Sequence, residues 1–84
     1  MNKVPIIFSK HIQQRIKDRN LDKQWILNAI ESPDKTVLRT VEEVYYFKKI
    51  ADFAGRCLKV VFNPTKNLVV TAYFDRKMTK NNCT

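Results

Sequence analysis

The change in hydrophobic spacing at Pro33 is the feature that most constrains the fold of this 84-residue chain. Before Pro33, apolar residues recur three or four positions apart, as they do on one face of a helix. From Lys35 onward, β-branched and aromatic residues form short runs between turn residues, as they do in strands. A chain with helices first and strands afterwards is predicted to belong to the α+β class.

Two helices are predicted before this change. Ser9 is a good N-cap, so a first helix should run from about Lys10 to Arg19. Asp22 can cap a second helix from about Lys23 to Ser32, which Pro33 ends. The short connection between the helices predicts an αα-hairpin. The side chains expected to be buried in this hairpin are Phe8, Ile12, Ile16, Trp25, Ile26, Ala29 and Ile30.

Four strands are predicted after Pro33, in an antiparallel sheet that packs both helices on one face. They cover Thr36–Thr40, Val44–Ile50, Arg56–Phe62 and Leu68–Phe74. The predicted fold is a single α+β domain over residues 1–84, with the element order α-α-β-β-β-β. Residues 5–78 are expected to be ordered, and residues 79–84 are expected to form a frayed tail.

The register of the last hairpin is predicted from its apolar pattern. Pairing Phe62 with Leu68 also pairs Val60 with Val70 and Leu58 with Ala72, which makes one face wholly apolar. This face should lie against the helices. The opposite face, which carries Lys59, Thr71 and Tyr73, should stay partly open to solvent.

The charge balance points to polyanionic partners. Sixteen Lys and Arg residues against eight Asp and Glu residues give a net charge of +8. Such an excess favours binding to nucleic acid, to an acidic protein or to an anionic surface. The sequence contains no apolar run long enough to span a membrane and no secretory leader pattern, so a cytoplasmic location is predicted.

Motifs for several classes of site are absent from the sequence. The single histidine and the two separated cysteines, Cys57 and Cys83, do not form a zinc motif. Cys57 is expected to be a small buried residue, while a disulfide between the two cysteines stays open. A glycine-rich phosphate loop and paired carboxylates are also missing, so no metal and no cofactor are predicted.

The stretch SKHIQQRIKDR, Ser9 to Arg19, carries a row of cationic candidates. His11, Arg15 and Arg19 are four residues apart and therefore lie along one side of the first helix. Their charges repel each other when protonated, so the row is better explained if an anion lies against it. The alternative is an ordinary basic solvent face of an amphipathic helix.

His, Arg, Lys and Tyr are the residue types needed to cleave RNA without a metal. RNA supplies its own nucleophile, the 2′-hydroxyl, and needs a base, an acid and cations around the phosphate. Histidine can act as base or acid near neutral pH, and arginine contacts phosphate oxygens with a planar fork. Further candidates for phosphate or RNA contacts are Lys48, Lys49, Lys59, Tyr73, Arg76 and Lys77.

Three stretches in order resemble a family of small bacterial domains of unknown function. They are FSKHIQQRIKDRNLDKQWILNAIESPDK, then VYYFKKI, then RCLKVVFNPTKNLVVTAYFDRK. The shared outline is an H-x-x-x-R helix, an Arg before the second helix, an SPD break, a Tyr/Lys strand and a hairpin that ends in V-T-x-Y. The resemblance covers about residues 7–77.

These domains are similar in layout to the RelE and BrnT toxins of bacterial toxin–antitoxin pairs. That resemblance implies a microbial-ribonuclease-like fold and a metal-independent endoribonuclease, with His11, Arg15 and Tyr73 as catalytic residues. It also implies RNA as the substrate and an acidic or DNA-binding antitoxin protein as a partner, with no membrane and no small-molecule cofactor. The alternative is an RNA- or protein-binding module on the same scaffold, without catalysis.

Overall fold

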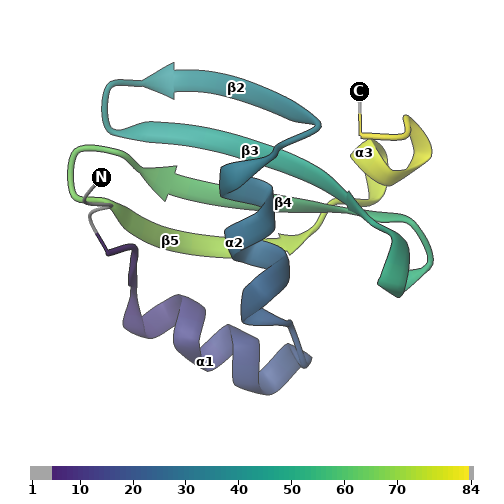
Figure 1. The fold of residues 1–84 in the computed structure, drawn as a ribbon, viewed down its shortest axis with the longest axis horizontal. Helices are drawn as coiled ribbons and strands as arrows, with labels where there is room; N and C mark the ends of the chain where they lie inside the picture. The colour runs from purple at the N-terminus through teal and green to yellow at the C-terminus, as the bar shows by residue number, and fades with distance from the viewer. Residues whose placement is uncertain (1–4, 84) are drawn as a thin grey trace.

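The computed structural model describes residues 5–83 and has an α+β fold. Two helices lie on one side of a sheet, and a short third helix follows β5 and lies beside the start of β4 (Figure 1). The elements are β1 (Ile7–Phe8), α1 (Lys10–Arg19), α2 (Lys23–Glu31), β2 (Lys35–Thr40), β3 (Glu43–Ile50), the 3-10 helix η1 (Ala51–Phe53), β4 (Arg56–Asn63), β5 (Leu68–Phe74) and α3 (Arg76–Lys80).

Side-chain and backbone caps fix the ends of the two long helices. The Ser9 hydroxyl accepts a hydrogen bond from the Ile12 N–H at 3.1 Å, and the Asp22 carboxylate accepts one from the Gln24 N–H at 2.8 Å. Asn20 adopts the left-handed conformation, with φ of 52°, and closes α1. The predicted bounds of α1 are confirmed, and α2 ends one residue earlier than expected, at Glu31.

The sheet has five strands in the order β1-β5-β4-β3-β2, and it is mixed. The four predicted strands form antiparallel neighbours, but β1 pairs with β5 in parallel. The prediction of four antiparallel strands therefore missed one strand. β1 has only two residues, too few to show an alternating pattern, and the Ile7 N–H donates to the Asn67 carbonyl at 2.9 Å.

The predicted register of the last hairpin is wrong. Val60 pairs with Ala72, and the register shifts between Val61 and Phe62, so Phe62 pairs with Val69. Val70 is left as the extra residue of a β-bulge and is 38% exposed, whereas Val69 is fully buried. Because of the bulge, Val69 and Ala72 both face the core although they are three residues apart, which breaks the strict alternation of a strand. The apolar pattern alone does not reveal this break.

The main core lies between the two long helices and the sheet. Helix residues Ile12, Ile26 and Ala29 pack there, and Ile16, Trp25 and Ile30 are partly buried against it. The strand residues of this core are Ile50, Leu58, Val60, Phe62, Val69 and Ala72. The prediction that the helices cover one apolar sheet face is confirmed for Leu58, Val60, Phe62 and Ala72, but Val69 takes the core position in place of Leu68 and Val70.

Of the tail predicted at residues 79–84, the structure places residues 79 and 80 in α3 and residues 81–83 in the turn that follows it, and Thr84 lies outside the described residues. Asp75 caps α3, and a disulfide joins Cys83 to Cys57 of β4. The two cysteines pack with Phe47 in a second buried cluster. Successive strand residues alternate in direction, so Cys57 and Lys59 lie on the sheet face opposite the long helices, here called the open face. The segment after Asp75 covers one end of the open face.

Candidate functional site

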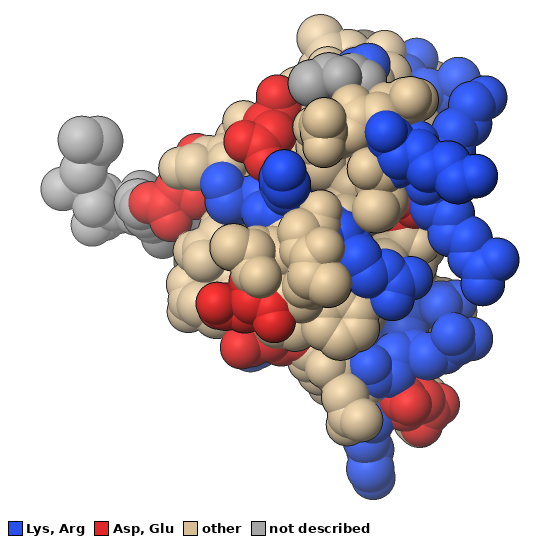
Figure 2. Space-filling model, turned by 90° about the vertical axis from the view of Figure 1, so that its right-hand side faces the viewer, with Lys and Arg blue, Asp and Glu red and all other residues tan. Residues whose placement is uncertain are grey.

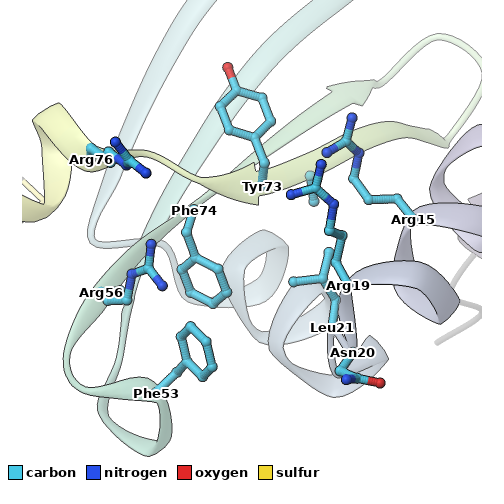
Figure 3. A pocket seen from close by; sticks show the side chains of 10 residues that line it. Arg15, Arg19, Asn20, Leu21, Phe53, Arg56, Tyr73, Phe74 and Arg76 are labelled. Atoms are coloured by element: carbon cyan, nitrogen blue, oxygen red, sulfur yellow. The ribbon is translucent and has the colours of Figure 1, made fainter.

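A cavity of about 260 Å³ opens between the end of α1, the η1 loop and the end of β5. Four arginines from separate parts of the chain line it: Arg15, Arg19, Arg56 and Arg76. The other lining residues are Asn20, Leu21, Phe53, Ala72, Tyr73 and Phe74. In Figure 3, Arg15 and Arg19 lie on one side of Phe74, and Arg56 and Arg76 lie on the other.

Helix α1 supplies Arg15 and Arg19, which are one helical turn apart. The Ser9 hydroxyl anchors the start of the helix to β5 by donating to the Val70 carbonyl at 2.8 Å. The helix therefore brings its arginines to the end of β5, next to Tyr73. Arg15 is half-buried, and its Nε is a buried donor that lacks a hydrogen-bond partner among the described residues. An unpaired buried donor is costly, and an anion would satisfy it.

An aromatic wall orients Arg56. The rings of Phe53 and Phe74 stack with centroids 4.6 Å apart, and Trp25 lies at 5.6 Å from Phe53. The Arg56 guanidinium carbon lies 5.3 Å from the centroids of both Phe53 and Phe74. Such cation–π contacts hold the planar guanidinium over the rings while its N–H donors stay available.

The loop before β4 depends on two backbone positions. Ala54 and Gly55 both have positive φ, at 56° and 68°, which turn the chain so that Phe53 returns over Phe74. Gly55 is the only glycine of the chain. A Cβ at Gly55 would lie 3.1 Å from the Lys49 Cε, which belongs to a flexible exposed side chain, so the positive φ is the main reason that glycine suits this position.

The charge around the cavity favours an anionic ligand. Of the described residues that line it, none is acidic, so four guanidinium groups face the same space without a carboxylate. Arginine forks match the oxygen geometry of phosphate and carboxylate. On the face of the molecule shown in Figure 2, Lys and Arg side chains gather along one side. The arrangement can hold a phosphate group with several forked contacts.

His11 lies in an adjoining groove rather than in the cavity. This groove, of about 160 Å³, is lined by His11, Gln14, Asp18 and the same Arg15 and Arg19. His11 is exposed, one turn before Arg15 on α1. The structure thus brings Arg15, Arg19, Tyr73 and Arg76 of the predicted residues together and places His11 at their edge.

The predicted lysines lie elsewhere. The Lys48 ammonium group donates to the Ser32 carbonyl at the end of α2 at 2.9 Å. The backbone N–H of Lys49 donates to the Asp34 carboxylate at 2.7 Å. Lys59 lies on the open face, with its Nζ 5.4 Å from the Tyr73 ring centroid. Lys77 is an exposed residue of α3. None of these four lysines lines the cavity.

Sequence reasoning missed Arg56 and its aromatic wall. Arg56 is the first residue of a strand, where a charged residue is common. Phe53 lies in the connection between two strands, which carries no recognisable motif. The one available signal was the lone glycine just before Arg56, since an isolated glycine in this setting indicates a tight turn. Within residues 5–83 no group of three or more His, Cys, Asp or Glu side chains is arranged to hold a metal ion.

Fold and site together define a small basic α+β domain with an arginine-lined cavity at the edge of its sheet. The chain belongs to the family described as "Domain of unknown function (DUF4258)", whose model matches residues 8–74. The match covers α1 to β5, and so includes every cavity residue except Arg76. No curated protein and no solved structure matches the chain. The prediction of a small family of unknown function is confirmed.

Proposed function

We propose that this protein is a small endoribonuclease that binds RNA at the arginine-lined cavity and cleaves it without a metal. The observation that carries the proposal is the convergence of Arg15, Arg19, Arg56 and Arg76 around Tyr73, with no acidic lining residue. RNA is the polyanion that carries its own nucleophile. Arg15 and Arg19, which line both the cavity and the groove of His11, would stabilise the extra negative charge that develops on the phosphate during the reaction.

The chemistry follows from the residues at hand. The 2′-hydroxyl oxygen attacks the adjacent phosphorus and loses its proton to a base, while the bond from phosphorus to the 5′-oxygen breaks. An acid donates a proton to that leaving oxygen. The products are a 2′,3′-cyclic phosphate and a 5′-hydroxyl. His11 and Tyr73 share the two proton transfers, and Arg15 lies beside both, lining the groove of His11 and the cavity of Tyr73.

The resemblance to the RelE and BrnT toxins supports the same proposal, since it implies the same reaction on a similar layout of helices and sheet. It adds an acidic or DNA-binding antitoxin protein as a partner. The net charge of +8 suits such a partner. Within residues 5–83, no helix is both long and apolar enough to cross a membrane.

One observation favours a second candidate, an RNA-binding module without catalysis. His11 lies outside the cavity that holds the arginines and Tyr73, so a phosphate seated deep among the four arginines would leave the histidine to one side. The catalytic proposal therefore requires the scissile phosphate to lie near Arg15 and Arg19, at the border of the cavity and the groove.

Incubation of the purified protein with total RNA in EDTA separates the two candidates. The endoribonuclease should release fragments with 2′,3′-cyclic phosphate ends, and His11→Ala should slow cleavage by about 10²–10⁴-fold while RNA binding persists. Lys10→Ala is the matched control, because Lys10 is an exposed residue of the same turn that lines neither the cavity nor the groove. Tight RNA binding without any cleavage would support the binding module instead.

A further inference from the structure

We infer that the ligand is single-stranded RNA whose bases stack on a row of aromatic and cationic side chains across the open face. This row, here called the ladder, consists of Arg39, Tyr45, Lys59 and Tyr73, one residue from each of β2, β3, β4 and β5. The inference rests on the proposed function, because it names the strandedness of the RNA bound at the arginine-lined cavity.

Close contacts run along the whole ladder. The Lys59 Nζ lies 4.0 Å from the Tyr45 ring centroid and 5.4 Å from the Tyr73 centroid. The Arg39 guanidinium carbon lies 5.6 Å from the Tyr45 centroid. Lys59 and Tyr73 are direct cross-strand partners, which fixes their side chains on one face. The result is an alternation of cations and rings, two of each.

The ladder is continuous with the cavity at Tyr73, which belongs to both. Tyr73 is 37% exposed, so its ring is accessible from solvent. The Thr71 hydroxyl, two residues earlier on the same strand, is buried without a hydrogen-bond partner among the described residues, as is the Arg15 Nε. A strand of RNA that leaves the cavity past Tyr73 would therefore meet rings and cations on one surface.

The chemistry of the ladder selects unpaired bases. In a duplex, the faces of the bases stack on each other and are hidden, whereas single strands expose them to aromatic side chains and to guanidinium planes. Lys59 can contact the backbone phosphates beside the stacked bases, whereas the Arg39 Nε lies 3.9 Å from the Glu43 carboxylate. An acidic protein can also pair with cations and pack on tyrosine rings, but the ladder continues at Tyr73 into a cavity lined by four arginines that suits phosphate groups, which is why RNA is the occupant we favour.

The test measures affinity by fluorescence anisotropy with 2′-O-methyl decamers, which lack the nucleophilic hydroxyl and stay intact. Three labelled probes share one sequence: a single strand, the same strand with abasic positions in its centre, and a duplex. Wild-type protein should bind the single strand more tightly than either other probe. Tyr45→Leu should weaken binding of the base-containing strand by about 5- to 100-fold per stacked base, and should change the abasic strand less than about twofold.

Two variants serve as controls for Tyr45→Leu. Tyr45→Phe keeps the ring and loses only the hydroxyl that donates to Glu43 at 2.9 Å, so it should bind like the wild type even if Tyr45→Leu folds poorly. Leu38→Ala changes an exposed apolar residue of β2 and should bind like the wild type too. Equal losses on base-containing and abasic strands, or tighter binding of the duplex, would overturn the ladder.

The cavity is tested separately in the same assay. Arg56→Gln should weaken the base-containing and abasic strands by the same factor, because Arg56 lines the cavity and is not part of the ladder. One outcome is that Arg56→Gln leaves affinity unchanged while Tyr45→Leu still weakens only the base-containing strand. That result would contradict RNA binding at the cavity and support base stacking on the ladder. A loss of affinity in Arg56→Gln without a base-dependent loss in Tyr45→Leu would contradict the ladder alone. Unchanged affinity for every strand in both variants would contradict both.

Discussion

Arg19 is the residue whose contribution to phosphate binding is simplest to isolate. It ends α1, is exposed and lines both the cavity and the groove. Arg19→Gln should lower RNA affinity about tenfold, since a charge-assisted hydrogen bond is worth about 1.5–3 kcal/mol. The slope of log affinity against log salt should become shallower by about 0.7, as for the loss of one single-strand phosphate contact.

Lys17→Gln is the matched control for Arg19→Gln. Lys17 lies in the same last turn of α1 and carries the same charge, but lines neither the cavity nor the groove. The two variants therefore remove equal net charge. Equal losses of affinity in both would show that overall charge, rather than the cavity, holds RNA.

At the same scale, sequence reasoning found the residues that a motif or a regular spacing marks. Arg15 and Arg19 follow from the four-residue spacing in a capped helix, and Tyr73 and Arg76 follow from the end of a clear strand. Arg56 could not be found, because its role depends on a left-handed loop that brings Phe53 over Phe74. The position of His11 beside the cavity also depends on the packing of α1 along β5, which no local pattern encodes.

The loop between β3 and β4 is the element that builds the aromatic wall, and two opposite substitutions test it. Gly55→Ala should reduce the free energy of unfolding by about 1–3 kcal/mol, because φ is 68° and a Cβ would press on Lys49. Ala54→Gly should leave stability unchanged or increase it, because Ala54 already has a φ of 56°. Urea unfolding curves of the two variants give both values. A stable Gly55→Ala would contradict the loop conformation.

The last hairpin offers a test of the bulge at Val70. Val69→Ala should cost about 2 kcal/mol, because Val69 is fully buried, whereas Val70→Ala should change stability by less than about 0.5 kcal/mol. The regular register predicted from the sequence gives the reverse ranking. Chemical denaturation of the two variants distinguishes the registers. The sequence predicted the strands correctly because the alternation of apolar residues is local. It did not predict the pairing of β4 with β5, because one extra residue in a strand shifts every cross-strand pair beyond it.

Across the whole molecule, the disulfide ties the C-terminal segment to the sheet. It closes a sequence separation of 26 residues, so its loss should lower the free energy of unfolding by about 3–4 kcal/mol. Thermal melts of the wild type with and without reductant, and of Cys83→Ser, should show this loss. Reductant should bring the wild type close to Cys83→Ser and leave the variant unchanged. A wild-type melt that reductant does not alter would show that the bond is absent or unimportant.

The same bond bears on where the protein works. Disulfides persist in oxidising compartments and are rare in the cytosol, so the redox state of the compartment decides whether this bond persists. The cysteines are far apart in the sequence and match no common motif, and for that reason the sequence left the pairing open. Only the packing of α3 beside the start of β4 brings Cys57 and Cys83 together.

The central claim is that the arginine-lined cavity binds phosphodiesters, and NMR of the arginine Nε–H signals tests it directly. The chain has five arginines, and Arg39 lies outside the cavity beside Glu43. The probe is dimethyl phosphate, a phosphodiester without a base. The account predicts that the signals of Arg15, Arg19, Arg56 and Arg76 shift together along one saturation curve while Arg39 stays in place. Shifts that are confined to Arg39, or spread equally over all five arginines, would contradict it.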